Sequence, residues 1–413
     1  MTGCVGSSLE QTPLPVEPQT ASQTPTSVSP PADASPDAAL DDDAPVSRRD
    51  EPSAAPTRLS AATTVAVRNA CRQPALAGHR ACDAIVRVDA GGSLAIGSCN
   101  RTAPYCASAL QAAYGLAQAA RSGGKGAIVG IVVAYGYSKA ASDLAVYRKT
   151  MGLPSCGTSN GCLRIVNQSG RARELPKPNA DSSDDWRAEA ALDLDMISAI
   201  CPNCKIVLVQ ANSNKSSDLA AGVNAAVASG AIAVGNSYSA KEENGSDAAY
   251  RHPGRAIIAS AGNGGAESRA PCSYAAVVCV GGTTLLAGSA GRGWNERAWR
   301  DGGSGCSAYV AKPSWQHVKV CRTRAEVDVS AVADPATGVA VYESPGGWQA
   351  MGGTSVGTAI VAALFALGPS AGRANPPQWI WRHGGGSAYH QVAAASGYDG
   401  PTGWGSPNGT GGF

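Results

Sequence analysis

The chain has 413 residues, of which 44% are apolar and 15% charged, and its formal net charge is +2. Its length allows a large core, and its near-neutral charge argues against a nucleic-acid binder. The longest apolar stretches, Gly126 to Tyr137 and Gly357 to Leu367, are about a dozen residues long, whereas a membrane-spanning helix needs roughly 18. The composition therefore favours an α/β or β-rich enzyme without a transmembrane segment.

Residues 1–60 are rich in Pro, Ser, Thr and Ala and contain no aromatic residue. Such a segment cannot bury a core, so we expect a disordered tether. Thr2-Gly3-Cys4 resembles the last residues of a bacterial lipobox, in which the cysteine is acylated. A chance match is the other interpretation, because three residues are few. We expect an extracytoplasmic protein, either secreted or held at the cell surface as a lipoprotein.

The next residues, 61–104, are expected to form a partly ordered extension with a short strand at Ala84–Val88. A single domain is predicted over 105–413, where apolar strands alternate with helices. The predicted helices are Ser108–Ala120, Asp143–Met151, Trp186–Ile200 and Ser217–Ser229, and the predicted strands are Ala127–Val133, Lys205–Gln210, Ala231–Val234, Ala256–Ser260 and Ala276–Val280. This succession predicts an α/β fold with a doubly wound, mainly parallel sheet and helices on both faces.

Twelve of the 13 cysteines fall into neighbouring couples. Six disulfides are expected: Cys71 with Cys82, Cys99 with Cys106, Cys156 with Cys162, Cys201 with Cys204, Cys272 with Cys279, and Cys306 with Cys321. Disulfides on this scale indicate an oxidising compartment. The alternative is a zinc site at Cys201-Pro202-Asn203-Cys204, but the five histidines are scattered singly and supply no second ligand pair.

Two carboxylates stand four residues apart in the predicted helix Trp186–Ile200, at Glu189 and Asp193. They therefore project from the same side of the helix, while Asp195 points away from them. If the pair is partly buried, it should hold one proton between its members, which raises one pKa toward the range useful for proton transfer. A solvated acidic helix face is the simpler interpretation.

Two further segments contain residues suited to acyl transfer. In Gly352-Gly353-Thr354-Ser355 a glycine turn opens an apolar helix, and Ser355 stands at the helix N-terminus, where backbone N–H groups favour negative charge. Ser355 is either a nucleophile or a helix cap. In Ala261-Gly262-Asn263-Gly264 a glycine-flanked amide follows a buried strand. Asn263 is either a turn residue in the left-handed region or an oxyanion donor.

These segments, with Asn236-Ser237-Tyr238 after a strand and the ending Gly397-Tyr398-Asp399 to Gly403-Trp404-Gly405, resemble the sedolisin family of serine-carboxyl peptidases. The resemblance covers roughly residues 100–413 and implies a subtilisin-like fold.

The resemblance implies a catalytic triad of Glu189, Asp193 and Ser355 and a serine-type endopeptidase acting on polypeptides. Ser355 would attack the peptide carbonyl, Glu189 would take and return its proton, and Asp193 would orient Glu189. Asn236, Ser237 and Tyr238 would form a wall of the substrate cleft. An acidic pH optimum is expected, because a carboxylate base is best matched to acidic conditions.

The chain also departs from the family pattern. Asn263 stands where most sedolisins carry an Asp, and Ala359 replaces a proline after the nucleophile. Near the C-terminus Gln391 and Ala395 replace residues of the family's calcium site, which leaves Asp399. Since calcium prefers six to eight oxygen ligands, we expect no calcium cofactor or a degraded site. We also expect the family's large prodomain to be absent or reduced.

Two other functions compete with a peptidase. One is a catalytically silent relative that binds peptides through the same cleft, which the departures from the family favour and the intact Glu189, Asp193 and Ser355 oppose. The other is a zinc-stabilised structural protein, which predicts free thiols. For the peptidase and for the peptide-binding relative alike we expect a monomer. No glycine-rich loop carries the lysine or acidic partner of a nucleotide site.

Overall fold

A computed structural model describes residues 65–73, 75–88, 101–245, 247–289, 291–370, 372–373, 375–392 and 397–413. The predicted tether at 1–60, including Cys4, lies outside these residues. The chain divides into two compact units between residues 61 and 62, and all described residues belong to the second unit, Ala62–Phe413. The predicted boundary between an extension and the main domain at 104/105 stays a prediction.

The core of this unit is a sheet whose strands run in the order β12-β11-β9-β7-β4-β6-β5, with β15 paired to β11. All neighbours are parallel except β11 and β12. This confirms the mainly parallel α/β sheet. The strands are β4 Ile128–Ala134, β5 Leu163–Asn167, β6 Lys205–Ala211, β7 Ala233–Asn236, β9 Ala256–Ser260, β11 Val277–Ala287, β12 Trp294–Ala298 and β15 Val329–Val332.

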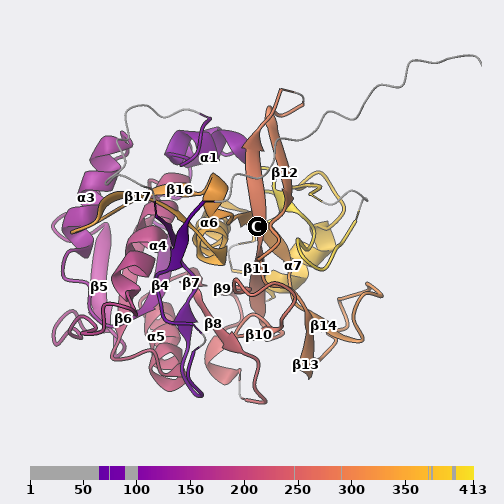
Figure 1. Ribbon diagram of the computed structural model, residues 1–413, viewed down its shortest axis with the longest axis horizontal. Coiled ribbons are helices and arrows are strands. Elements are labelled where there is room, and N and C mark those ends of the chain that lie inside the picture. The colour runs from indigo at the N-terminus through magenta and orange to yellow at the C-terminus, as the bar shows by residue number, and fades with distance from the viewer. Residues whose placement is uncertain are drawn as a thin grey trace, which may run out of the picture. The chain divides into compact units, whose positions relative to one another are not determined.

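Helices cover both faces of the sheet, as predicted (Figure 1). Helix α5 (Ser216–Ala228) approaches one face so closely that a Cβ at Gly130 would lie 3.0 Å from Ala226 Cβ. The other face packs against α4 (Trp186–Ile200) and α6 (Thr354–Leu367), and a Cβ at Gly235 would lie 3.7 Å from Ala362 Cβ. Small residues on the strands thus let the helices lie close to the backbone.

The remaining helices frame this core. They are α1 Ala107–Ala113, α2 Ala117–Ser122, α3 Ala140–Thr150 and α7 Pro376–His383, with short 3₁₀ turns η1 Ala248–Tyr250 and η2 Pro335–Thr337. The single helix predicted at Ser108–Ala120 is wrong, because the chain breaks between α1 and α2. Gly115 adopts a φ of +66° there, which a side-chain-bearing residue rarely adopts and which ends the helix.

The N-terminal residues form strands β1 (Val67–Asn69), β2 (Ala81–Cys82) and β3 (Ile85–Arg87). These do not make a separate layer. One small sheet has the order β1-β3-β17-β16 and a second β10-β8-β2, where β8 is Tyr238–Lys241, β10 Arg269–Ala270, β16 Val339–Glu343 and β17 Gly347–Gly352. In Figure 1 this indigo segment passes over α4 beside α6.

Two hairpin-like pairs complete the described strands: β13 (Cys306–Ala311) with β14 (Thr323–Ala325), and β18 (Tyr389–His390) with β19 (Ser406–Pro407). None of the described helices has the length and apolar character required to cross a bilayer.

Five predicted disulfides are confirmed: Cys71–Cys82, Cys156–Cys162, Cys201–Cys204, Cys272–Cys279 and Cys306–Cys321. The sixth prediction involves Cys99, which lies outside the described residues. The alternative of a zinc site at Cys201 and Cys204 is wrong, because two sulfurs joined in a disulfide are not thiolates and cannot bind zinc in the usual way.

Candidate active site

Helix α4 carries the two carboxylates into the interior. Its N-terminus is capped by Asp185, whose side chain accepts the backbone N–H of Arg187 at 3.2 Å. Glu189 lies in the first turn and Asp193 one turn further on, and both are buried. The solvated acidic face considered from the sequence is therefore wrong for this pair: their side of the helix packs against other parts of the chain.

Helix α6 brings the hydroxyl to the same place. Gly353 precedes it with a φ of +95°, which favours glycine, and the helix begins at Thr354. Ser355 is buried, and its Oγ donates to Glu189 Oε2 at 2.9 Å across 166 positions of sequence. Ser355 is not the helix cap, since Gly353 holds that position and no side chain caps it. The hydroxyl is free to point at the carboxylate.

The hydrogen bonds of the carboxylate pair are incomplete. Ser237 Oγ donates to Asp193 Oδ1 at 2.7 Å. Glu189 Oε1 and Asp193 Oδ2 are buried and, among the described residues, have no hydrogen-bond partner. Burial, reinforced by the charge of Asp193, holds the pKa of Glu189 well above its usual range, and burial raises the pKa of Asp193 to about 8. One proton held by the pair removes its mutual repulsion.

Asn263 follows the carboxyl end of β9 and is held rigidly. Its Oδ1 accepts the backbone N–H of Thr354 at 2.9 Å and the Thr354 hydroxyl at 3.1 Å. Its Nδ2 is thereby directed to a carbonyl oxygen, that of Asp83, at 2.8 Å. The left-handed turn position is taken by Gly262, with a φ of +87°, rather than by Asn263. The amide lies beside the start of α6 and acts as a donor to a peptide carbonyl.

The predicted cleft wall at Asn236, Ser237 and Tyr238 divides into two roles. Asn236 is buried and donates to the carbonyls of Val234 and Ile258, and Tyr238 OH donates to Asn236 Oδ1 at 2.8 Å. These two side chains brace the interior. The backbone has the second role, because Tyr238 begins β8, which pairs with β2 of the N-terminal segment.

Sequence reasoning missed the segment that lies against these residues. The backbone N–H of Ala84 donates to Glu189 Oε2 at 2.8 Å, and the carbonyl of Asp83 accepts from Asn263. The only signal in the sequence was the predicted strand at Ala84–Val88, which the structure contains as β3. Nothing in the residues of this strand indicated that it would lie against α4, more than a hundred residues further along the chain.

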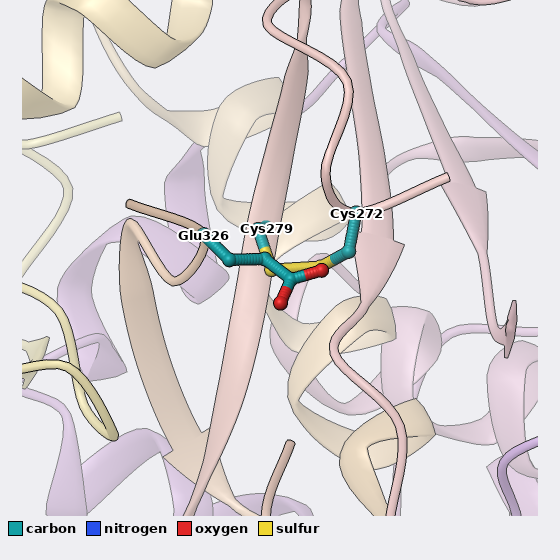
Figure 2. Close-up of side chains that lie close together, drawn as sticks. All are labelled: Cys272, Cys279 and Glu326. Atoms are coloured by element: carbon teal, nitrogen blue, oxygen red, sulfur yellow. A yellow bond between two sulfur atoms is a disulfide. The ribbon is translucent and has the colours of Figure 1, made fainter. Parts of the chain in front are cut away.

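One cluster within the described residues has the composition of a metal site, at Cys272, Cys279 and Glu326, whose ligand atoms lie within 4.8 Å of one another. Figure 2 shows that the two sulfurs are bonded to each other beside the Glu326 carboxylate. A disulfide offers no thiolate, so the donor set does not fit a transition metal. Glu326 Oε1 instead accepts the backbone N–H of Arg269 at 2.8 Å.

The residues expected to form a degraded calcium site are engaged elsewhere. Asp399 accepts hydrogen bonds from the backbone N–H and the hydroxyl of Thr402, and Gln391 Oε1 accepts the N–H of Gly397 at 3.0 Å. Ala395 lies outside the described residues. Asp399 is the single carboxylate among the predicted calcium positions, and its oxygens are already hydrogen-bonded, so these positions do not fit calcium.

Comparisons with known proteins bear on the fold and on the family resemblance. A model of the subtilase family matches residues 179–383. Sedolisin from Pseudomonas sp. (strain 101) is 35% identical over 166 residues, an alignment that covers 33% of this chain and only 28% of that protein. The structure of Pseudomonas sedolisin, a serine-carboxyl proteinase complexed with two molecules of pseudo-iodotyrostatin, matches with a TM-score of 0.60 at 22% identity over 76% of this chain and 96% of that one. The predicted subtilisin-like fold and the resemblance to sedolisins are confirmed.

Proposed function

We propose that this chain, a relative of the sedolisins with a subtilisin-like fold, is a serine-type endopeptidase that hydrolyses polypeptides with Ser355, Glu189 and Asp193. The observation that carries the proposal is the hydrogen bond from Ser355 Oγ to Glu189 Oε2 at 2.9 Å. A nucleophile and its base must stand within hydrogen-bond reach, and the described residues place no histidine in that position.

In this mechanism Glu189 transfers the proton, and Asn263 stabilises the negative charge that develops on the substrate oxygen. Ser355 Oγ attacks the substrate carbonyl as its proton passes to Glu189 Oε2. The oxygen that becomes negative accepts a hydrogen bond from Asn263 Nδ2, which Thr354 holds in place. Glu189 then delivers the proton to the leaving nitrogen. Water next attacks the acyl-enzyme, and Glu189 takes a proton from the water and returns it to Ser355 Oγ as the acyl group leaves. Asp193 positions Glu189 and shares a proton with it.

An acidic to neutral working range follows from this pair. The competent form holds one proton, with Glu189 able to accept from Ser355. Because burial raises the pKa of both carboxyls, that of Asp193 to about 8 and that of Glu189 well above its usual range, the pair holds a proton at acidic and neutral pH and loses it only in alkali. Two charged, buried carboxylates then repel each other. Activity should therefore fall on the alkaline side.

The disulfides support an extracytoplasmic location, secreted or at the cell surface, because cytosolic thiols are kept reduced. We propose that the protein acts as a monomer and without a bound cation.

Digestion of a denatured protein at pH 3 to 5 by the wild type and by Ser355→Ala tests the proposal. We expect cleavage by the wild type and loss of at least 10³-fold in the variant, because the nucleophile is gone. Equal cleavage by both proteins would assign the activity to a contaminant. Absence of cleavage in both, with retained peptide binding, would favour the catalytically silent relative instead.

A further inference from the structure

The N-terminal strands meet the candidate active site in the arrangement of a bound peptide. Before Asp83 the chain pairs antiparallel with β8, Ala81 opposite Ser239 and Cys82 opposite Tyr238. After it the chain pairs antiparallel with β17, where Ile85 lies opposite Gly352. The segment Arg80–Arg87 thus adds to two strand edges, one before and one after Asp83, a common mode of peptide recognition.

The peptide bond between Asp83 and Ala84 lies where the reaction requires it. The Asp83 carbonyl accepts from Asn263 Nδ2 at 2.8 Å, and the Asp83 N–H donates to the Ser237 carbonyl at 3.2 Å. On the other side of the bond, the Ala84 nitrogen lies 2.8 Å from Glu189 Oε2, the atom that also accepts from Ser355. The oxyanion donor and the proton donor for the leaving nitrogen therefore bracket this one bond.

The side chain of Asp83 fills a polar pocket. It is 1% exposed, and its oxygens accept from Ser239 Oγ at 3.0 Å and from Ser260 Oγ at 2.6 Å. Arg269 lies close enough for its positive charge to favour the ionised form of Asp83, and its Cδ and Nε lie 2.3 Å and 2.9 Å from where a Cβ at Gly262 would be. Glu267 binds Arg269 Nη2 at 2.7 Å, whereas Arg269 Nε is buried without a hydrogen-bond partner among the described residues.

From this arrangement, and resting on the proposed function, we propose that Asp83–Ala84 is an internal cleavage site held in the cleft, and that Ser239, Ser260 and Arg269 select an acidic side chain before the cleaved bond. Hydrolysis breaks the bond between the Asp83 carbonyl carbon and the Ala84 nitrogen. Water supplies a hydroxyl to the carbon and a proton to the nitrogen. Until the segment leaves, no other polypeptide reaches Ser355.

Cleavage here is visible without reduction, because Cys71 and Cys82 both lie on the amino side of the bond and their disulfide does not join the two products. Purified wild type and Ser355→Ala, incubated and followed by intact mass and N-terminal sequencing, give the first test. We expect a product beginning at Ala84 in the wild type and none in the variant. An intact Asp83–Ala84 bond in a wild type that digests other proteins would overturn the internal site and leave the proposed function standing.

Substitutions at the pocket test the selectivity. Asp83→Leu leaves two buried hydroxyls without an acceptor, and we expect product beginning at residue 84 to appear at least about tenfold more slowly. Asp301→Leu, an exposed acid, is the control and should cleave as the wild type does. Equal rates in Asp83→Leu and the wild type would overturn the pocket assignment.

Peptides in trans remove any effect of these changes on folding. The protein, purified as the whole chain and allowed to process itself, is given Ala-Ala-Asp-Ala-Ile-Val and the matched peptide with Leu in place of Asp. We expect the Asp peptide to be cleaved about tenfold or more faster, and Arg269→Gln to reduce that ratio while Arg251→Gln, an exposed arginine, leaves it unchanged. A ratio near one in the wild type contradicts the selectivity. If no Ser355-dependent cleavage of any substrate occurs, the proposed function itself fails.

Discussion

Asn263 is the side chain whose removal most directly tests the oxyanion position. Asn263→Ala deletes the donor that now binds a peptide carbonyl at 2.8 Å, and we expect kcat to fall by about 10²- to 10³-fold with a smaller change in KM. Asn203→Ala is a matched control, because that amide donates to the carbonyls of Ala120, Arg121 and Gly123 far along the chain from Ser355. An unchanged kcat in Asn263→Ala would remove it from the mechanism.

Asn263→Asp separates the donor role from the structural one. The variant keeps an oxygen to accept from Thr354, but it donates only when its carboxyl is protonated. We expect activity close to the wild type at low pH and a steep additional loss as the pH rises through the pKa of the new carboxyl. The ratio of variant to wild-type kcat, measured from pH 3 to 7, should decline; a ratio independent of pH contradicts the donor role.

Asp193→Asn tests the shared proton. In the wild type the pair loses its shared proton in alkali, whereas an amide in place of Asp193 supplies a permanent N–H. We expect the alkaline fall of the pH profile to disappear in the variant. Asp195→Asn is the control: Asp195 is equally buried but accepts from the Tyr342 N–H, away from the pair, and its variant should keep the alkaline fall.

At the scale of elements, the junction between β17 and α6 is sterically tight. A Cβ at Gly353 would lie 1.9 Å from the Asp83 carbonyl oxygen and 3.3 Å from Asn263 Nδ2. Gly353→Ala should therefore displace the segment Arg80–Arg87 and the start of α6 together. We expect a loss of both activity and stability.

Gly126→Ala separates this clash from the backbone strain. Gly126 also has a positive φ, of +82°, but nothing lies within 4 Å of its added Cβ, so it should cost only about 1 kcal/mol and leave activity intact. Thermal unfolding and peptide hydrolysis measured on both variants check the difference. Equal effects of the two substitutions would show that crowding at Gly353 has no functional part.

At the scale of the whole described unit, buried carboxylates should make the protein more stable in acid than in alkali. Burial raises the pKa of Asp193 and Glu326 to about 8, of Glu343 to about 7 and of Asp83 to about 6. The folded state holds these protons more tightly than the unfolded state. The resulting stability is fully present below the ordinary carboxyl pKa and is lost as the pH rises through about 6 to 8.

His390 acts in the opposite direction, because burial lowers its pKa to about 4 and its contribution destabilises the folded state as the pH falls from the ordinary histidine pKa through 4. Urea unfolding of Ser355→Ala, which cannot digest itself, should give a higher free energy of unfolding at pH 5 than at pH 9. A higher value at pH 9 contradicts the assignment of buried protonated carboxyls.

Calcium removal gives a further test on the whole unit. Since Asp399 is engaged with Thr402 and Gln391 with Gly397, we expect dialysis against EGTA to leave the melting temperature within about 1 °C and the hydrolysis rate unchanged. A marked drop that added calcium reverses would show that a cation is held by the protein.

The sequence by itself determined the local features. Alternation of apolar runs predicted the sheet, and the helix Trp186–Ile200 was predicted with the bounds that the structure gives to α4. The pairing of near neighbours predicted the disulfides, because short loops leave few partners within reach. The order of motifs indicated which serine and which carboxylates meet.

Only the tertiary structure decided where the helices break and which other segments lie beside the serine and the carboxylates. The break between α1 and α2 depends on one backbone dihedral at Gly115, and the brace formed by Asn236 and Tyr238 depends on packing. The strand at the candidate active site depends on pairing between Cys82 and Tyr238, 156 positions apart in the chain. Short strands carry too little local signal to specify such distant partners, so the occupant of the site emerged only once the chain was folded.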